Sequence, residues 1–341
     1  MENVFFVMEW IERMVGRLRK KMSEKDIASF LVTESSNISY MVGMNDFSGV
    51  LYVSEDEWQL FVSKFFKHCF PNVSNVSVFG TGDELKKMVS RKGESFVSDK
   101  PSFFDFDVEQ NGLINDMRLV KDDLEIDRIR EACRIGDSVF ESFVKSFKPG
   151  MTEWECVKII DSGFREKGVY NSFDTLVHRN SVRPHRLPTD SVTEEGDLVI
   201  VDMGCKFKNY CGDMTRMVPT KVSGRRKQLL EDVISIQEKA VSKVRPGISV
   251  SELCGIVGEL VEDAGYSYEN HFLHSLGHGL GVDIHEAPNV SEGSDFVLEE
   301  GNVITIEPGL YIEELGGCRI EDTVAVNSSG AEVLTRSRKK F

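Results

Sequence analysis

In the stretch VDMGCKFKNYCGDMTR, residues 201–216, Asp202 ends an apolar run and Asp213 follows eleven positions later. A turn at Phe207 and Lys208, midway between them, would form a β-hairpin and make the aspartates cross-strand partners, with Cβ atoms about 4.5–5.5 Å apart. Desolvated carboxylates at that separation must share a proton or be neutralised by a cation. The sequence therefore predicts a hairpin whose two carboxylates need a shared proton or a cation to neutralise their charge.

The acidic hairpin has a second copy later in the chain. Its two strands recur as matching segments: EGDLVIVDMG (195–204) with EGNVITIEPG (300–309), and GDMT (212–215) with IEDT (320–323). Asp202 then corresponds to Glu307, and Asp213 corresponds to Glu321, with three extra residues in the later hairpin. Each copy is expected to present one carboxylate pair to a common point.

The helices before each hairpin repeat as well. KPGMTEWE (148–155) matches RPGISVSE (245–252), and both contain a capping box that begins a helix. In each copy a long helix precedes the Pro-Gly break, ending at Phe147 or at Val244. Two related halves of helices and antiparallel hairpins predict an α+β domain with approximate internal two-fold symmetry.

A length of 341 residues suggests two domains, at roughly 150 residues each. We expect a smaller α/β domain over 1–117 and the duplicated domain over 118–341, beginning with an amphipathic helix at Asp122–Phe147. The first domain is predicted to contain a helix at Trp10–Met22 and strands at Phe30–Val32, Val50–Val53, Gln59–Val62, Val76–Phe79 and Phe96–Val97.

Composition narrows the class of function. A net charge of −15 disfavours a nucleic-acid partner, because such a chain repels the phosphate backbone. No apolar run approaches the roughly 18 residues that a membrane span needs. The seven cysteines are odd in number, scattered and without a C-x-x-C pair, which favours free thiols. With no basic leader at the N-terminus, we expect a cytoplasmic protein.

Four repeated acids favour a metal site. One acid alone would be solvated at a strand end or paired with Lys206, Arg216 or Arg319, but four at repeat-related positions favour divalent ions. HSLGHGLGVDIHEAP, residues 274–288, supplies histidines that transition ions prefer to oxygen alone. Its glycines favour a strand or loop, and no H-E-x-x-H zinc motif is present.

The ordered motifs VDMG, GDMTR, HSLGHGLG with HEAP, IEPGLY and RIEDT resemble those of the pita-bread metallopeptidases, a family that includes Xaa-Pro aminopeptidases, prolidases and methionine aminopeptidases. The resemblance covers about residues 118–327. The N-terminal part, with NISYMVG (37–43), resembles the creatinase-type domain of the Xaa-Pro-cleaving branch. Methionine aminopeptidases lack that domain, which disfavours them.

The resemblance implies a dinuclear metal centre of Mn²⁺, Co²⁺, Fe²⁺ or Zn²⁺. Asp202 would bind one ion, His278 and Glu307 the other, and Asp213 and Glu321 both. A hydroxide bridging the ions would attack the scissile carbonyl, and Glu307 would act as the base.

The same resemblance implies residues around the substrate. His185, in NSVRPH (180–185), would stabilise the leaving group or intermediate, and His285 would lie near the amine or carbonyl. His274 and Arg319 would line the pocket and support the ligands. The implied reaction is hydrolysis of the Xaa-Pro bond at the N-terminus of short peptides. The resemblance also implies a homodimer.

Substrate length stays open. Many prolidases have an arginine after the HE-x-P motif to hold a substrate carboxylate, and this chain has Asn289 there. Arg183, Arg186 or Arg319 are the alternatives for that task. Two other functions remain: a catalytically inactive pita-bread protein that binds peptides, and a creatinase-like hydrolase that uses no metal. Hydrolysis of Ala-Pro and Ala-Pro-Ala, with metal analysis, separates these functions.

Overall fold

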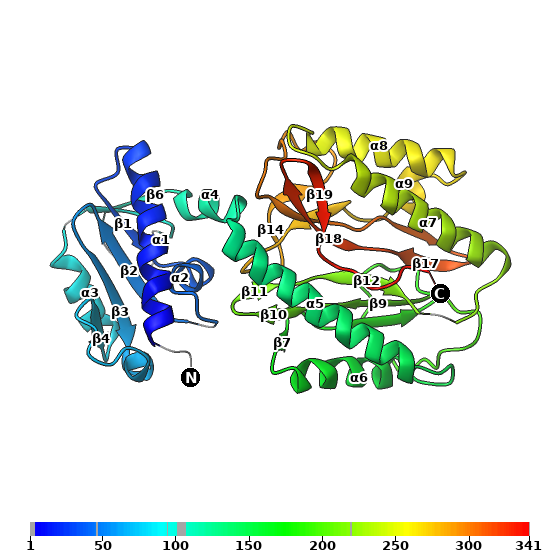
Figure 1. Cartoon of the computed structure of the whole chain (residues 1–341), viewed down its shortest axis with the longest axis horizontal. Coiled ribbons are helices and arrows are strands. Elements are labelled where there is room, and N and C mark those ends of the chain that lie inside the picture. The colour runs from blue at the N-terminus through cyan, green and yellow to red at the C-terminus, as the bar shows by residue number, and fades with distance from the viewer. Residues whose placement is uncertain (1–3, 46, 94, 101–106, 219, 341) are drawn as a thin grey trace. The chain divides into compact units, whose positions relative to one another are not determined.

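The computed structural model describes residues 4–340 other than 46, 94, 101–106 and 219. The chain divides into two units, Met1–Arg118 and Leu119–Phe341, with the division one residue from the predicted boundary. Among the described residues, no helix combines the length and the apolar character needed to cross a membrane. Each unit has its own sheets and helices (Figure 1).

The N-terminal unit is built on a mixed sheet with the strand order β4-β3-β2-β1-β5-β6. Its strands are β1 (Ser29–Val32), β2 (Gly49–Ser54), β3 (Trp58–Ser63), β4 (Val76–Phe79), β5 (Ser95–Ser98) and β6 (Asp107–Gln110). Its helices are α1 (Val4–Glu24), α2 (Ser35–Val42), η1 (Lys64–Cys69), α3 (Gly82–Ser90) and α4 (Leu113–Leu119). The five predicted strands are confirmed, and α1 begins at Val4, earlier than the predicted Trp10.

The second unit consists of two similar halves. The first half contains α5 (Asp123–Ser146), α6 (Glu153–Glu166), β7 (Tyr170–Asn171), β8 (Leu176–Arg179), β9 (Val199–Met203), β10 (Cys205–Phe207), β11 (Tyr210–Cys211) and β12 (Met214–Met217). The second half contains α7 (Gly224–Lys243), α8 (Val250–Asp263), α9 (Tyr268–His271), β13 (Gly277–Gly279), β14 (Glu286–Val290), β15 (Val303–Ile306), β16 (Gly309–Ile312), β17 (Gly316–Arg319), β18 (Asp322–Asn327) and β19 (Gly330–Val333).

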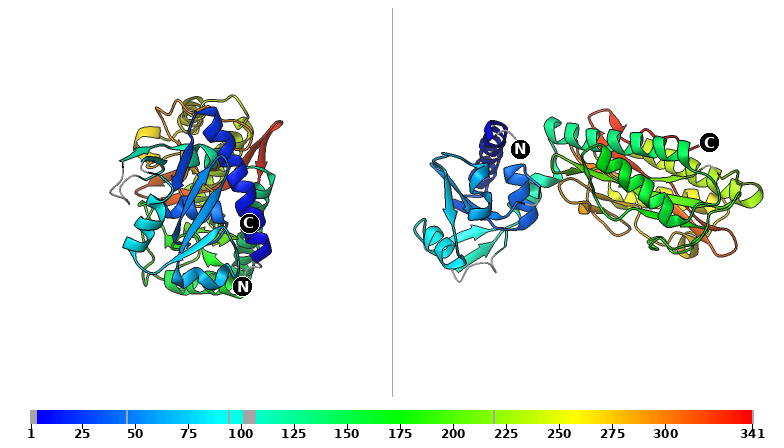
Figure 2. Two further views of the ribbon diagram at one scale, coloured as in Figure 1. Left: turned by 90° about the vertical axis from the view of Figure 1, so that its left-hand side faces the viewer. Right: turned by 90° about the horizontal axis from the view of Figure 1, so that it is seen from below.

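Each half of this unit has a pair of helices that packs against strands of its own half. α5 and α6 lie together on one side, and α7 and α8 lie on the other (Figures 1 and 2). Each pair closes its own apolar core, in which Phe140 and Ile160 pack in the first half and Val233 and Val257 in the second. The predicted α+β duplication is present in three dimensions.

The start of the second helix repeats in detail in both halves. Thr152 caps α6 in a complete capping box with Glu155, and Ser249 caps α8 by accepting from the backbone N–H of Glu252. For α8 only this half of the predicted box forms. The Glu252 carboxylate lies instead 3.8 Å from the Arg245 guanidinium, an ion pair that competes for the same oxygens.

The predicted turn of the first hairpin is wrong by one residue. Lys208 and Asn209 form the turn with φ values of 43° and 73°, a left-handed pair typical of two-residue hairpin turns. The register therefore pairs Asp202 with Thr215, so Asp202 and Asp213 are not direct cross-strand partners as predicted. Asp213 lies two residues before Thr215, so its side chain is on the same face of the hairpin as that of Thr215. It is therefore diagonal to Asp202.

In the second hairpin the acids do face each other. Ile306 pairs with Asp322 and Gly309 with Arg319, so the register between these pairs sets Glu307 opposite Glu321. The two hairpins meet where the backbone N–H of Glu321 donates to the Thr215 carbonyl at 3.1 Å. This junction places the acidic ends of both hairpins beside each other.

A buried ion pair also joins the halves. The Arg216 guanidinium donates to Asp322 at 2.7 Å, and both side chains are fully buried. Asp322 also pairs with Lys339 at 2.6 Å, so the larger loss is expected on removing Asp322, which would leave the buried Arg216 guanidinium without a counter-charge, at a cost of about 3–5 kcal/mol. Arg216 is thus committed to Asp322 and is not the partner of the four predicted acids.

Candidate metal centre

A cavity of about 520 Å³ lies between the two hairpins and the histidine-rich segment. All five predicted ligands line it, namely Asp202, Asp213, His278, Glu307 and Glu321. The remaining lining residues are Phe173, Leu176, His185, His274, Ser275, Ile284, His285, Glu286, Ala287 and Asn289. Residues more than a hundred positions apart in sequence therefore converge on one point, as the repeat predicts.

Three side chains form the tightest group. One ligand atom each from Asp213, His278 and Glu321 lies within 4.8 Å of the others, close enough to hold a metal ion. The Nε2 atom of His278 is 3.5 Å from Asp213 Oδ2 and 3.6 Å from Glu307 Oε1. These distances bring Glu307 to the same centre as the three.

The buried carboxylates of this cavity have too few positive charges and hydrogen bonds from the described residues to balance their negative charge. Burial raises the pKa of Asp213 and of Glu321 well above the usual range, and neighbouring carboxylates add to the effect. Burial likewise raises the pKa of Glu307 to about 8, against the opposing effect of Arg319. Asp213 Oδ1 is buried and accepts no hydrogen bond from any described residue. Divalent ions fit this donor set, because they would supply both the missing charge and the missing partner.

Arg319 is the one guanidinium that contacts the cluster directly among the described residues. Its Nη2 donates to Asp202, its Nε donates to Thr215 Oγ1 at 3.1 Å, and its Nη1 donates to the Tyr311 hydroxyl at 2.9 Å. The Thr215 hydroxyl donates in turn to Glu321 Oε2 at 2.7 Å. Arg319 thus supports acids from both hairpins, as expected of a residue behind the ligands.

The His278 side chain is a neutral imidazole. Burial lowers its pKa to about 4, so Nε2 is free of a second proton at neutral pH. Its backbone N–H donates to Thr305 Oγ1 at 3.0 Å. A Cβ on Gly277 would lie 2.0 Å from the Thr305 carbonyl oxygen, and one on Gly279 would lie 2.3 Å from the Ala287 carbonyl oxygen. The backbones therefore approach closely at these two glycines, which lie in strand β13, in agreement with the predicted strand or loop.

The other predicted histidines surround the cavity. The His285 ring centroid lies 4.4 Å from that of His278, and the His185 centroid lies 6.2 Å from that of His274. The His274 Nε2 atom is 3.0 Å from the Tyr311 hydroxyl, and burial lowers the pKa of His274 to about 3. His274 is therefore a neutral hydrogen-bonding residue at the wall.

Sequence reasoning missed two residues of this network. Tyr311 links His274 to Arg319, and Thr215 links Arg319 to Glu321. Both occur inside the motifs IEPGLY and GDMTR. Their position next to ligands in those motifs was the available signal.

The duplicated domain with buried acids and a neutral imidazole defines a metallopeptidase. The chain belongs to metallopeptidase family M24, whose model matches residues 127–328. Residues 14–92 match the creatinase/prolidase N-terminal domain. The predicted pita-bread fold, preceded by a smaller creatinase-type domain, is confirmed.

Full-length relatives agree with this assignment. The chain is 31% identical to an Xaa-Pro dipeptidase of Pyrococcus horikoshii, over 98% of this chain and 100% of the relative. An Xaa-Pro dipeptidase structure from Bacillus anthracis superposes with a TM-score of 0.88 at 30% identity, covering 97% and 99% of the two chains. An X-Pro aminopeptidase structure from Thermotoga maritima gives 0.85 at 30% identity, covering 96% and 98%. The prediction of a metallo-exopeptidase is confirmed.

Proposed function

We propose that this chain is a dinuclear metal-dependent Xaa-Pro dipeptidase, which hydrolyses the bond between an N-terminal residue and a following proline. One observation carries the proposal: four buried carboxylates and one neutral imidazole, drawn from both halves, line a single cavity. The Pyrococcus relatives named Xaa-Pro dipeptidase align with nearly the whole chain and support this substrate class.

The charge at the centre favours two ions. When ionised, the four carboxylates with the one Arg319 guanidinium leave three uncompensated negative charges, more than one divalent ion neutralises. Asp202 would hold one ion, His278 and Glu307 the other, and Asp213 and Glu321 both. Two divalent ions, when bound, supply Lewis-acid activation of the attacking water and of the substrate carbonyl.

The remaining chemistry belongs to side chains of this chain. Glu307, which lies 3.6 Å from the His278 imidazole at the centre of the cavity, would accept the proton of the attacking water at a carboxylate oxygen and return it to the leaving proline nitrogen. His285 and His185 line the cavity and would donate hydrogen bonds to the substrate carbonyl and to the intermediate. Arg319 would keep Asp202 oriented.

An Xaa-Pro aminopeptidase acting on longer peptides is the second candidate. The structural similarity to the Thermotoga maritima enzyme supports it. Asn289, in place of the arginine that many prolidases have after HE-x-P, also supports it, because that position here cannot bind a substrate carboxylate as a cation.

The test combines metal analysis with two substrates. Protein stripped with a chelator and reloaded with Mn²⁺, Co²⁺, Fe²⁺ or Zn²⁺ should contain two ions per chain and release alanine from Ala-Pro. Release from Ala-Pro-Ala at a higher kcat/KM would select the aminopeptidase. Absence of metal-dependent release from both would leave an inactive peptide-binding protein or a creatinase-like hydrolase.

Two further properties remain predictions. A homodimer is expected from the family resemblance, and light scattering on a size-exclusion column would measure the mass against the 38.5 kDa of one chain. A cytoplasmic location is expected from the sequence, and fractionation of the source cells would test it.

A further inference from the structure

The proposed dipeptidase needs a cation that the metal centre does not supply. An Xaa-Pro dipeptide ends in a carboxylate beside an apolar ring, and an arginine is the side chain that best binds a carboxylate, through two parallel hydrogen bonds. Asn289 lines the cavity at the HE-x-P motif without a charge. The inference below rests on the proposed function and names the residue that recognises this end of the substrate.

Two arginines near the cavity are already committed. Arg319 is fully buried and donates to Asp202, to Tyr311 and to the Pro184 carbonyl. Arg186 pairs with Glu153, whose side chain is completely buried, so withdrawing Arg186 would strand a buried charge. Neither guanidinium is available to a substrate.

Arg183 differs from both. It is exposed, and no carboxylate of the described residues lies within ion-pair distance of it. It lines a second hollow of about 520 Å³ together with His185, Arg186, Leu187, Pro188 and Thr189. His185 lines the metal cavity as well, so the two hollows adjoin at this residue.

The second hollow matches the chemistry of a C-terminal proline. Leu187 exposes 63% of its surface there, which gives an apolar wall beside the Arg183 cation. Burying an apolar ring against such a side chain is favourable, at about 25 cal/mol per Å². The carboxylate and the ring of a terminal proline would therefore contact Arg183 and Leu187, which lie four positions apart on one segment.

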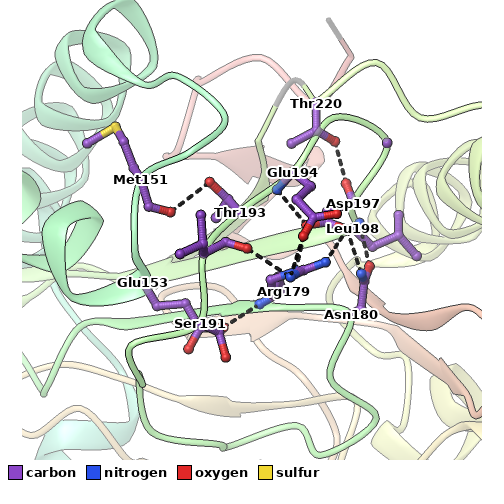
Figure 3. A network of polar contacts seen from close by, with 12 residues as sticks. Met151, Glu153, Arg179, Asn180, Ser191, Thr193, Glu194, Asp197, Leu198 and Thr220 are labelled. Carbon is purple, nitrogen blue, oxygen red and sulfur yellow. Dashed lines mark hydrogen bonds and ion pairs between the residues drawn. The ribbon is translucent and has the colours of Figure 1, made fainter.

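The segment is anchored to the scaffold on both sides of the hollow, and Figure 3 shows the anchor on the Arg179 side, with Glu153 and Asp197. Before it, the Arg179 backbone N–H donates to Glu153 at 2.8 Å, and the Arg179 side chain pairs with Asp197 at 2.6 Å. After it, the Thr189 backbone N–H donates to Glu153 at 2.8 Å. Buried Glu153 thus holds both ends of the segment that carries Arg183.

The middle of the segment is tied to the metal centre. The Pro184 carbonyl, between Arg183 and His185, accepts from Arg319 Nη1 at 3.1 Å. The same guanidinium donates to Asp202. The Arg183 backbone is therefore fixed relative to the proposed ligands, as a specificity residue requires.

We propose that Arg183 receives the terminal carboxylate of an Xaa-Pro dipeptide, with the prolyl ring against Leu187. In this assignment the substrate carboxylate is bound by the segment after β8. In many prolidases it is bound by an arginine at the position that Asn289 has here. Longer peptides lack a carboxylate at this point, so Arg183 favours dipeptides over them.

The test compares substrates that differ only in charge. Metal-loaded wild-type, Arg183→Gln and Arg183→Lys proteins are assayed on Ala-Pro and on alanyl-prolinamide, which has no carboxylate. Arg183→Gln should lower kcat/KM for Ala-Pro about 10- to 100-fold, mainly through KM, and leave alanyl-prolinamide within about 2-fold. Arg183→Lys should retain an intermediate activity, because it keeps the charge and loses the paired geometry.

Arg225→Gln is the matched control, since Arg225 is an exposed arginine on α7. Equal kcat/KM in wild type and Arg183→Gln, or equal losses on both substrates, would overturn the inference while leaving the dipeptidase function intact. A wild-type protein that cleaves neither substrate with any metal would refute the proposed function itself. Unchanged metal content and Tm in Arg183→Gln exclude misfolding as the cause.

Discussion

The two acidic hairpins have matching sequences and different registers. In the first, Asp202 lies opposite Thr215, whereas the second sets Glu307 opposite Glu321. The first closes through a two-residue turn, and the second closes through a longer turn that ends at Gly316 with a φ of 104°. Both copies of the repeat therefore supply acids from corresponding places in the hairpin. The length of the turn sets the register, and the register determines which residue lies opposite each acid.

The hairpins also differ in charge. Arg319 precedes Glu321 by two residues, and the equivalent position before Asp213 is Cys211. The single guanidinium of the second hairpin donates to Asp202 of the first. The two halves are therefore not interchangeable: one supplies a cation that supports an acid of the other.

The largest effect is expected from removing one acid of either hairpin. Asp213→Asn and Glu321→Gln should each lower kcat/KM more than about 100-fold, beyond the usual loss for a residue that only supports a ligand. Both should also lose metal, because each is proposed to bind both ions. Elemental analysis with the Ala-Pro assay measures this.

Glu313→Gln, in the exposed turn of the second hairpin, is the control for these acids and should keep both metal and activity. If either ligand variant retained two ions and wild-type turnover, the two hairpins would not share one centre.

Arg319→Met tests the asymmetry of charge. It should lower the free energy of unfolding of the metal-free protein by about 3–5 kcal/mol, since it leaves buried Asp202 without its cation. Bound Mn²⁺ should reduce this loss by supplying positive charge at the same place. Urea unfolding with and without Mn²⁺ measures the difference; an equal loss in both conditions would contradict the proposed role.

The acids of both hairpins should make the metal-free protein less stable as pH rises. Burial raises the pKa of Glu307 to about 8, and that of Asp213 and Glu321 well above the usual range, so the folded state holds protons that the unfolded chain has released. Stability should therefore fall by a few kcal/mol from about pH 4.5 to 8.

The measurement is urea unfolding in a chelator across that pH range. The Mn²⁺-loaded protein is the reference, since bound ions favour the ionised acids and should flatten or reverse the trend. Parallel curves with and without Mn²⁺ would contradict the prediction.

The smallest effect compares the helix caps of the two halves. Thr152→Ala should cost about 1–2 kcal/mol of unfolding free energy, because it breaks a complete capping box, and Ser249→Ala about 0.5–1 kcal/mol. Urea unfolding of the metal-loaded protein ranks the two variants. A larger loss for Ser249→Ala would show that the halves differ in some way other than their caps.

Much of the architecture follows from local patterns. The amphipathic helix predicted from Asp122 forms as α5, and Val76–Phe79 forms the predicted strand with the same bounds. The turn of the first hairpin was missed because Lys208 and Asn209 adopt positive φ, which Asn tolerates and the spacing of two acids does not reveal.

In the candidate site, too, some features could be predicted from the sequence and others could not. The repeat predicts that Asp202, Asp213, Glu307 and Glu321 converge, and all four line one cavity. The partners of these acids were less accessible: local pattern alone offered Lys206, Arg216 and Arg319, the family resemblance pointed to Arg319, and only the fold pairs Arg216 with Asp322.

The sequence by itself determined the duplicated domain and the four repeat-related acids that line its cavity, because strand alternation, helix caps and an internal repeat are local properties of the chain. The tertiary structure alone decided the registers, the position of Arg319 behind Asp202, and the exposure of Arg183 beside Leu187. Those outcomes depend on which distant side chains compete for the same buried partner, and that competition is settled only when both halves pack together.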